Sequence, residues 1–285
     1  EACENGKFIV SKVTRANKSK SPLPPFITST LQQEAFQRLG YQVKRTMRVA
    51  QELYEGVKLG EELGGAHGII TYMRTDSLRI SDEAAEAAKK YIISKYGEEY
   101  YPSRRRFFKT SAEAQDAHEA IRPSDVNLDP DTIKKYLTPD QYKLYKLIFD
   151  RFIASQMKNA ELDTMSADIS CGKYIFRASE YSVKFKGYLG IYADTDAPED
   201  SEKLTKVCDL AVGEELALDS VSGEQNFTSA PPHFNEASLI KFLKDKGIGR
   251  PSTYAPTITT IIDRGYVVRD KKTLRSTPLG EATGR

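Results

Sequence analysis

The residues with the clearest chemical potential are a tyrosine, an arginine and an aspartate spaced two positions apart. Tyr72, Arg74 and Asp76 follow the short apolar pair Ile69-Ile70. In an extended strand these three side chains would share one face. A phenol with a pKa of about 10 is a weak nucleophile at neutral pH, but a neighbouring arginine can grip a phosphate and neutralise charge that develops as phosphorus is attacked. The spacing is therefore compatible with covalent attack on a phosphodiester, but short motifs are weak signals, and spacing alone favours an ordinary edge strand.

A second polar group recurs at helical spacing further along the chain. Residues 112–121 are expected to form one helix that ends at Pro123. Four side chains share a face of this helix at spacings of three and four: Gln115, His118, Glu119 and Arg122. Such a histidine is more often a structural residue than a catalytic one, although its near-neutral pKa suits either a phosphate contact or a proton transfer.

The C-terminal region has the outline of a DNA-binding module. Asn235 is expected to cap a helix over 236–246, and a second helix begins after the turn at Gly247 and Gly249 and runs to Arg264. A hairpin over 266–279 follows. Arg250, Ser252 and Thr253 at the second helix N-terminus would form a phosphate pocket. Helix, turn, helix and basic hairpin also match a winged helix, so a non-catalytic DNA-binding module is the alternative function.

Two further basic clusters could contact nucleic acid. Lys44, Arg45 and Arg48 make a basic turn on a helix expected over 42–59. Residues 103–109 (SRRRFFK) place four cations beside two phenylalanines. Such a cluster could grip phosphates and stack on bases, or be a surface loop with two buried rings.

Four stretches together resemble one enzyme family. Residues 70–77 (ITYMRTDS) are similar to the active-site signature of bacterial type IA DNA topoisomerases. Three others resemble the same family in the same order along the chain: 28–33 (TSTLQQ), 114–123 (AQDAHEAIRP) and 247–255 (GIGRPSTYA). The resemblance spans about residues 26 to 266 and covers nearly all of the chain.

The resemblance implies a role for each site residue. Tyr72 would attack single-stranded DNA and keep the 5′ phosphate as a phosphotyrosine, Arg74 would stabilise charge on the phosphate, and His118 would lie beside the nucleophile. Asp76, Thr75 and Glu119 would have supporting roles, with Asp76 orienting Arg74. The implied DNA contacts are Gln115, Arg122, Arg250, Ser252, Thr253, Lys44 and Arg48.

The same resemblance sets expectations for cofactors and partners. The family binds Mg²⁺ through an N-terminal Toprim domain that has no visible counterpart here, and it needs no ATP because the phosphotyrosine conserves the bond energy. Asp194-Thr195-Asp196 lacks a third carboxylate, so no metal site is expected in this chain. The expected partners are DNA, preferentially single-stranded or underwound, and the rest of the same polypeptide. A tyrosine recombinase is disfavoured because Tyr72 comes early and His118 follows it.

At 285 residues, two or three domains of mixed α and β structure are expected. Strands are expected over 7–13, 164–171, 174–179, 181–191 and, as short pieces, 207–223. Helix caps are expected at Ser29, Ser81 and Thr138. The helix after Thr138 is expected to bury an apolar stripe of Tyr142, Tyr145, Phe149, Phe152 and Gln156. The simplest division is a β-rich hinge domain (1–27 with 159–227), an inserted helical domain carrying the tyrosine (28–158) and a partial helical DNA-binding domain (228–285). Proline-rich joints at 18–25 and 231–232 would be hinges.

Composition fits a soluble globular protein, and the topoisomerase resemblance implies the bacterial cytoplasm and association with the nucleoid. The chain is 29% charged, and no apolar run approaches the roughly 18 residues that a membrane span needs. Its three cysteines are scattered, which favours reduced thiols. Residues 1–60 and 226–285 each carry 10 Lys and Arg against 5 Asp and Glu, while the middle is acidic. A start without methionine suggests an excised piece.

Overall fold

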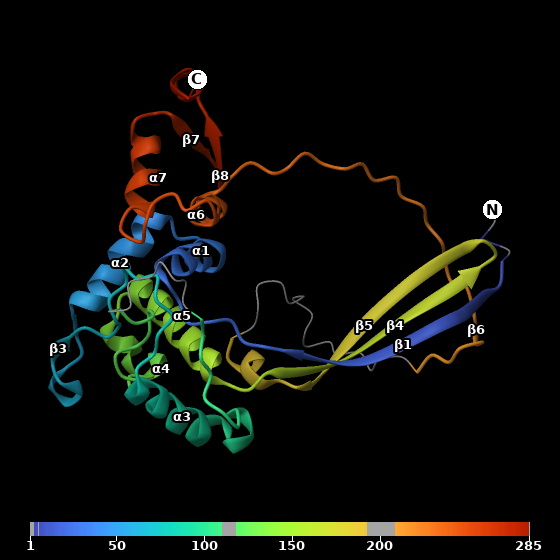
Figure 1. Cartoon of the computed structure of the whole chain (residues 1–285), viewed down its shortest axis with the longest axis horizontal. Coiled ribbons are helices and arrows are strands. Elements are labelled where there is room, and N and C mark those ends of the chain that lie inside the picture. Colours follow the sequence, from blue (N-terminus) through green and yellow to red (C-terminus); the bar gives the residue numbers. More distant parts are fainter. Residues whose placement is uncertain (1–2, 5, 110–117, 193–208, 285) are drawn as a thin grey trace. The chain divides into compact units, whose positions relative to one another are not determined.

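The computed structural model describes residues 3–4, 6–109, 118–192 and 209–284 (Figure 1). Its internal contacts divide the chain into two compact units, each made of two separate stretches. The β unit comprises Glu1–Pro22 and Lys158–Ala230, and the helical unit comprises Leu23–Met157 and Pro231–Arg285. Within the described part of the chain, no helix combines the length and apolarity that a membrane span requires.

The β unit is a narrow antiparallel sheet with strand order β5-β4-β1-β6 (Figure 1). Its strands are β1 (Phe8–Lys20), β4 (Ala160–Cys171), β5 (Tyr174–Phe185) and β6 (Glu215–Leu216). Gly172 has a φ of 58° at the tight turn between β4 and β5, a conformation that glycine adopts without steric cost. Cys3 and Cys171 are free thiols, and Cys208 lies outside the described residues.

Three strand predictions for the β unit need correction. The first strand does not stop at residue 13 but continues to Lys20, because β4 pairs with it as far as Lys20 opposite Ala160. This pairing occupies residues 18–20 of the proline-rich joint. The expected strands 174–179 and 181–191 are one strand that ends at Phe185. Of the pieces expected over 207–223, the described residues form only β6.

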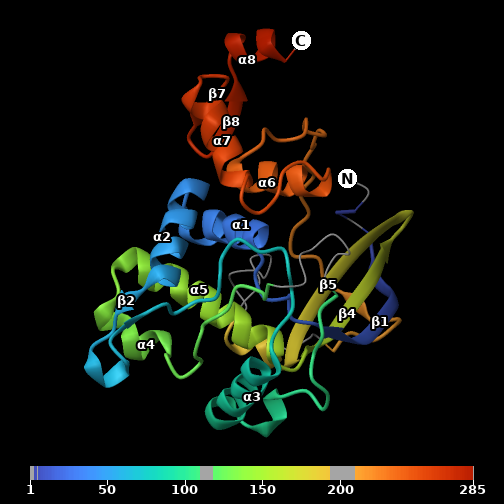
Figure 2. The same ribbon diagram turned by 60° about the vertical axis from the view of Figure 1, so that its left-hand side comes forward.

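The helical unit contains the elements that surround the candidate site (Figure 2). Its helices are α1 (Thr28–Leu39), α2 (Val43–Glu55), α3 (Asp82–Tyr96), α4 (Pro130–Ile133), α5 (Pro139–Gln156), α6 (Glu236–Asp245), α7 (Tyr254–Asp263) and α8 (Pro278–Thr283). Two short strand pairs accompany them: β2 (Val57–Lys58) with β3 (Ala66–His67), and β7 (Val267–Asp270) with β8 (Thr273–Ser276).

Helix α5 is the central core element of this unit. Thr138 caps it in a capping box with Gln141, and Pro139 occupies the first turn. The predicted apolar stripe is buried at Tyr145 and Phe149, and the burial continues through Phe152 to Gln156 at the end of the helix. Helices α1, α2 and α3 all pack against α5, which fixes the scaffold around the site.

Local sequence signals predicted the start of two other helices correctly and one end of each of two more wrongly. Ser81 caps α3 and Asn235 caps α6, as the sequence predicts. The predicted cap of α1 at Ser29 is wrong, because the helix begins at Thr28 and its cap is Ile27, two residues earlier, whose N–H donates to Thr30 Oγ1. Helix α2 ends at Glu55 rather than near residue 59, since Gly56 has a φ of 146° that breaks the helix.

Residues 231–285 pack onto the helical unit through a small apolar cluster. Val43 of α2 lies with Ile240 of α6 and with Tyr254 and Ile258 of α7. Glu236, only 2% exposed, accepts the backbone N–H of Val43 at 2.7 Å. Contacts therefore join this region to the stretch that carries Tyr72, although the sequence pattern predicts a separate domain here. The three-domain division stays a prediction.

Candidate active site

The segment that carries Tyr72 is not the predicted strand. Residues 71–80 have no regular secondary structure, and Ile70 makes only an isolated bridge to Pro123. The alternation of side chains is nevertheless present. Met73 and Thr75 are buried, while Tyr72 and its neighbours at 74 and 76 are partly exposed.

Thr28 fixes one side of this segment from the start of α1. Its hydroxyl donates to the carbonyl of Met73 at 2.7 Å and accepts the N–H of Thr75 at 2.9 Å. Its own N–H donates to the carbonyl of Thr75 at 2.9 Å. Thr28 is fully buried, so these bonds replace the missing strand partners of an irregular segment.

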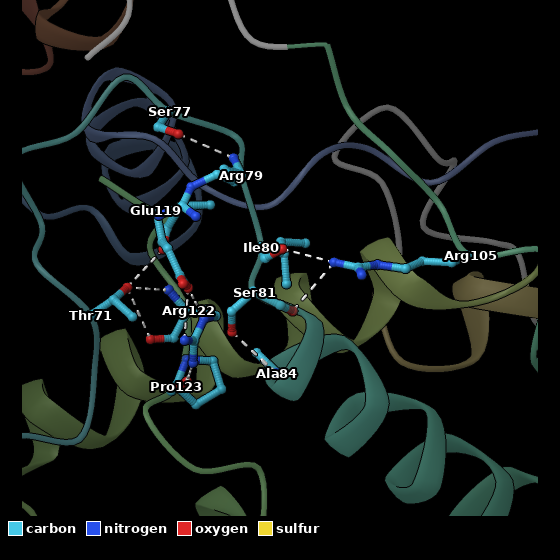
Figure 3. A network of polar contacts seen from close by, with 11 residues as sticks. Thr71, Ser77, Arg79, Ile80, Ser81, Ala84, Arg105, Glu119, Arg122 and Pro123 are labelled. Carbon is cyan, nitrogen blue, oxygen red and sulfur yellow. Dashed lines mark hydrogen bonds and ion pairs between the residues drawn. The ribbon is translucent and has the colours of Figure 1, made fainter. Parts of the chain in front are cut away.

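Thr71 fixes the other side of the segment against residues 120–122 (Figure 3). Its hydroxyl donates to the carbonyl of Ala120 at 2.7 Å and accepts the N–H of Arg122 at 3.0 Å. Its backbone N–H donates to the carbonyl of Arg122 at 2.9 Å.

The predicted helix over 112–121 is wrong where the structure describes it. His118, Glu119 and Ala120 are not helical, and Ile121 bridges to Phe26. The backbone groups of 120–122 bond to other segments instead, and a residue that precedes proline is biased towards extended geometry. Residues 110–117, which include Gln115, lie outside the described part of the chain.

The residues at 72, 74 and 76 open onto one cavity of about 360 Å³. Its lining is Tyr72, Arg74, Asp76, His118, Arg250, Pro251 and Ser252. Stretches separated by more than 170 positions in the sequence thus meet in one pocket. Its walls carry two guanidinium groups, a carboxylate, an imidazole and two hydroxyls. This combination suits an anionic ester whose oxygens accept hydrogen bonds.

Two aromatic side chains flank the Tyr72 ring. The His118 ring lies 5.5 Å away between centroids, and the Tyr54 ring packs edge-on at 5.3 Å. Tyr54 belongs to the last turn of α2 and is 39% exposed. These contacts hold the phenol ring between the imidazole of His118 and the ring of Tyr54.

The turn between α6 and α7 supplies Arg250, Pro251 and Ser252 to the cavity lining. Arg250 Nη1 donates to the carbonyl of Gly249 at 2.8 Å, and the Arg250 N–H donates to Thr253 Oγ1 at 2.8 Å. Burial raises the pKa of Tyr254, the charge of Arg250 opposes this shift, and the charge of Asp76 adds to it. Asp76 and Arg250 line the same cavity, so these two stretches lie close together.

Residues 1–283 match the family model for DNA topoisomerase. The chain belongs to the type IA DNA topoisomerase family. The solved structure of full-length topoisomerase I from Thermotoga maritima is similar to it, with a TM-score of 0.86 and 38% sequence identity over 98% of this chain. The chain spans 44% of that protein.

Other site residues predicted from the topoisomerase resemblance lie outside the cavity lining. Thr75 is buried, and Thr253 stabilises the turn below Arg250. Glu119 and Arg122 form an ion pair of 2.7 Å in which both side chains are mostly buried. This pair braces the segment that carries His118.

The basic turn on α2 also lies away from the cavity lining. Lys44 and Arg48 are exposed, whereas Arg45 makes a two-pronged bond to Asp140 at 2.7 and 2.8 Å. Because they are exposed, Lys44 and Arg48 are accessible to a DNA backbone. Their role in DNA binding stays a prediction.

Type IA topoisomerases use Mg²⁺, and the described residues of this chain do not suit a metal ion. They contain no group of three His, Cys, Asp or Glu side chains placed to hold one. Asp76 shares its cavity with Arg74 and Arg250, whose charges compete with a cation. Asp194-Thr195-Asp196 lies outside the described residues.

Three residues that build the candidate site are not predicted from the sequence. Thr28 and Thr71 hold the Tyr72 segment, and Tyr54 packs on its ring. Both threonines lie within stretches that resemble the family, so a search for buried hydroxyls near an irregular segment could have found them. Tyr54 has no local signal, because its contact with Tyr72 depends on how α2 packs.

Proposed function

We propose that this chain carries the strand-cleaving tyrosine of a type IA topoisomerase and acts on single-stranded DNA. Tyr72 Oη attacks a backbone phosphorus, a phosphotyrosine ester forms to the 5′ phosphate, and the 3′ oxygen leaves. The observation that carries this proposal is the cavity in which the phenol of Tyr72 meets Arg74, His118 and Arg250. A phenol, cations and a titratable imidazole are the groups that such a transfer requires.

The charges of the cavity define a role for each group. Arg74 neutralises the charge that grows on the phosphate oxygens as the fifth bond to phosphorus forms. Asp76 shares that wall and orients the guanidinium. His118, whose ring packs on Tyr72, contacts the phosphate or moves the proton that the phenol loses and the leaving 3′ oxygen needs.

The remaining cations and hydroxyls serve DNA positioning. Arg250 and Ser252 face the phosphodiester from the α6–α7 turn, with Thr253 holding that turn in place. Lys44 and Arg48 on α2 contact the DNA backbone, and so does Gln115. The Arg122–Glu119 pair acts mainly through the backbone beside His118.

In the whole enzyme, the freed 3′ hydroxyl would attack the phosphotyrosine after another strand has passed, and the bond would be restored without ATP. The net result is relaxation of negatively supercoiled DNA in the bacterial cytoplasm. The Mg²⁺ requirement and the Toprim domain belong to the rest of the polypeptide, and no step is assigned to the metal in this chain. The proline-rich joints at 18–25 and 231–232 would let the helical part move away from the rest of the enzyme. This movement would open the gap through which the other strand passes.

Covalent trapping tests the nucleophile. Single-stranded DNA labelled at its 3′ end is mixed with this chain, a Toprim domain supplied in trans and Mg²⁺, then rapidly denatured. The label should stay on the protein, because the 5′ phosphate of the downstream fragment is the end that is joined. Tyr72→Phe should abolish it.

Tyr54→Phe is the matched control, since it removes a phenol hydroxyl from the ring packed on Tyr72 and keeps the ring. It should retain the labelling. Labelling that persists in Tyr72→Phe would contradict the proposal. So would its absence when reassembly and DNA binding have been demonstrated separately.

The alternative is a DNA-binding module without chemistry. The order α6, turn, α7, β7 and β8 agrees with the winged-helix outline, and this identity stays a prediction. It requires DNA binding that is unchanged by Tyr72→Phe and no covalent product under any of these conditions.

A further inference from the structure

A second cavity of about 450 Å³ lies beside the N-terminus of α3. The lining residues that matter here are Arg79, Ser81, Arg105, Arg106, Phe107 and Phe108. They come from the segment that follows the Tyr72 motif and from the basic aromatic loop 103–109. The candidate active site uses none of them.

Two of the three arginines in this cavity are fixed by hydrogen bonds to the backbone. Arg105 Nη2 donates to the carbonyl of Ile80 at 2.8 Å (Figure 3). Its Nη1 pairs with Asp82. Arg106 Nε donates to the carbonyl of Met157 at 2.9 Å. Burial lowers the pKa of Arg106, and an anion in the cavity would favour its charged form.

Phe107 gives the cavity an exposed aromatic surface. Its side chain is 80% exposed, which is unfavourable for a ring with no polar atom. The guanidinium of Arg105 lies 5.0 Å from its centroid. An exposed ring beside fixed cations is the combination that single-stranded nucleic acid uses, with a base on the ring and phosphates on the cations.

The chain itself connects this cavity with the candidate active site. Asp76 lines the first cavity and Arg79 lines the second. Three extended residues span at most about 11 Å, so a few nucleotides can bridge the distance. Both cavities belong to the helical unit, so a strand joined to Tyr72 stays within reach of both.

We propose that the cavity of Arg79, Arg106 and Phe107 binds the single-stranded DNA segment that remains attached to Tyr72 after cleavage. Phosphates contact Arg79 and Arg106, and a base stacks on Phe107. The proposal rests on the proposed function for its assignment to the attached strand. The binding site itself can be tested without cleavage.

The first measurement is the affinity of the chain for a labelled single-stranded oligonucleotide, by fluorescence anisotropy. Phe107→Ala should raise Kd roughly tenfold, the effect of losing one stacked base. Arg79→Ala should reduce the slope of log K against log salt by about 0.7, as for one lost phosphate contact on a single strand. For a duplex of the same sequence, Phe107→Ala should leave Kd unchanged because its bases are already stacked.

Phe227→Ala is the matched control, because Phe227 is 81% exposed and lies in the β unit. Its Kd should equal that of the unaltered chain. If the chain binds DNA and Phe107→Ala behaves like this control, the second site is overturned while the proposed function stands. If the chain binds no single-stranded DNA at all, both fail. An equal loss of duplex affinity would overturn the assignment to single strands.

The second measurement locates the bound segment. In the trapped Tyr72 adduct, a 3′→5′ exonuclease trims the attached fragment until the protein blocks it. The fragment left on the unaltered chain should be longer than that left on Phe107→Ala. Equal lengths would overturn the assignment to the attached strand.

Discussion

At the scale of single residues, the Tyr72 segment depends on hydroxyls that hold it in place. It has no strand ladder, so Thr28 and Thr71 satisfy its backbone groups. Their removal should therefore disturb both stability and chemistry, whereas removal of a group that only faces the cavity should disturb chemistry alone. This difference separates positioning residues from reacting ones.

Thr28→Val should lower the free energy of unfolding by about 1–3 kcal/mol, because it leaves the buried N–H of Thr75 without its acceptor. Urea unfolding measures the change. Thr28→Ser keeps the hydroxyl and should recover most of the loss. A loss in Thr28→Ser with none in Thr28→Val would show that the methyl group, and not the hydrogen bonds, holds the segment.

Arg74→Ala should slow formation of the covalent adduct about 100-fold or more, since it removes a preorganised charge from the cavity. The rate is measured by trapping with single-stranded DNA and the Toprim domain in trans. Arg264→Ala, at the exposed end of α7, is the control and should react at the normal rate. Urea unfolding of Arg74→Ala should be unchanged, and a large destabilisation would argue for a structural role.

At the scale of elements, Glu236 joins three parts of the helical unit. It lies in α6, accepts the first N–H of α2, and pairs with Arg269 of β7 at 2.7 Å. A carboxylate at a helix N-terminus also interacts favourably with the helix dipole. The same α6 leads into the turn that brings Arg250 to the cavity.

Glu236→Gln should therefore lower the free energy of unfolding by about 1–3 kcal/mol, because a buried charge-assisted pair becomes a neutral contact. It should also weaken DNA binding through Arg250. Denaturant unfolding and anisotropy measure the two effects. Glu224→Gln, at an exposed position outside any helix or strand, should change neither. If Glu236→Gln unfolds with the same free energy as the unaltered chain, Glu236 does not hold these three parts together.

Asp129 makes stability depend on pH at the junction of α3 and α4. Burial by itself raises the pKa of this carboxyl, but hydrogen bonds from Lys95 and Tyr91, both 2.5 Å long, outweigh it and lower the pKa below its usual value. A lowered folded-state pKa gives stability that is present above the unfolded pKa of about 3.9. That stability is lost as pH falls through the folded value.

Asp129→Asn should therefore cost about 1 kcal/mol of unfolding free energy at pH 7, a modest value because the site is partly solvated. The cost should shrink as pH falls below about 4. Urea unfolding at several pH values measures it, with the exposed Asp263→Asn as control. A cost that stays constant with pH would show that the charge of Asp129 is not its source.

At the scale of the whole molecule, the chain spans 44% of the Thermotoga maritima topoisomerase I that it resembles. We expect the 285 residues alone to bind DNA weakly and not to relax supercoiled plasmid with Mg²⁺, because the acidic Toprim residues that the resemblance requires have no counterpart in this sequence. Agarose gel electrophoresis tests this. Relaxation that Tyr72→Phe abolishes would contradict the expectation.

Sequence patterns predicted much of the fold where the signal was local. Ser81, Thr138 and Asn235 were found as helix caps because a cap depends on its own side chain and on the next turn. The hairpin at 270–272 was found for the same reason. The helix around His118 was predicted wrongly, because its polar spacing imitates a helix while its backbone bonds to Thr71 and Phe26.

The sequence by itself determined the family and predicted which side chains react, because residue types and order within a motif do not depend on packing. Only the tertiary structure decided that Arg250 shares a cavity with Tyr72 and that Thr28 holds the Tyr72 segment. It also decided that Phe107 stays exposed beside fixed arginines. These relations join residues far apart in the chain, and they arise from the burial of α1, α2 and α5 against one another and from backbone groups that must find partners.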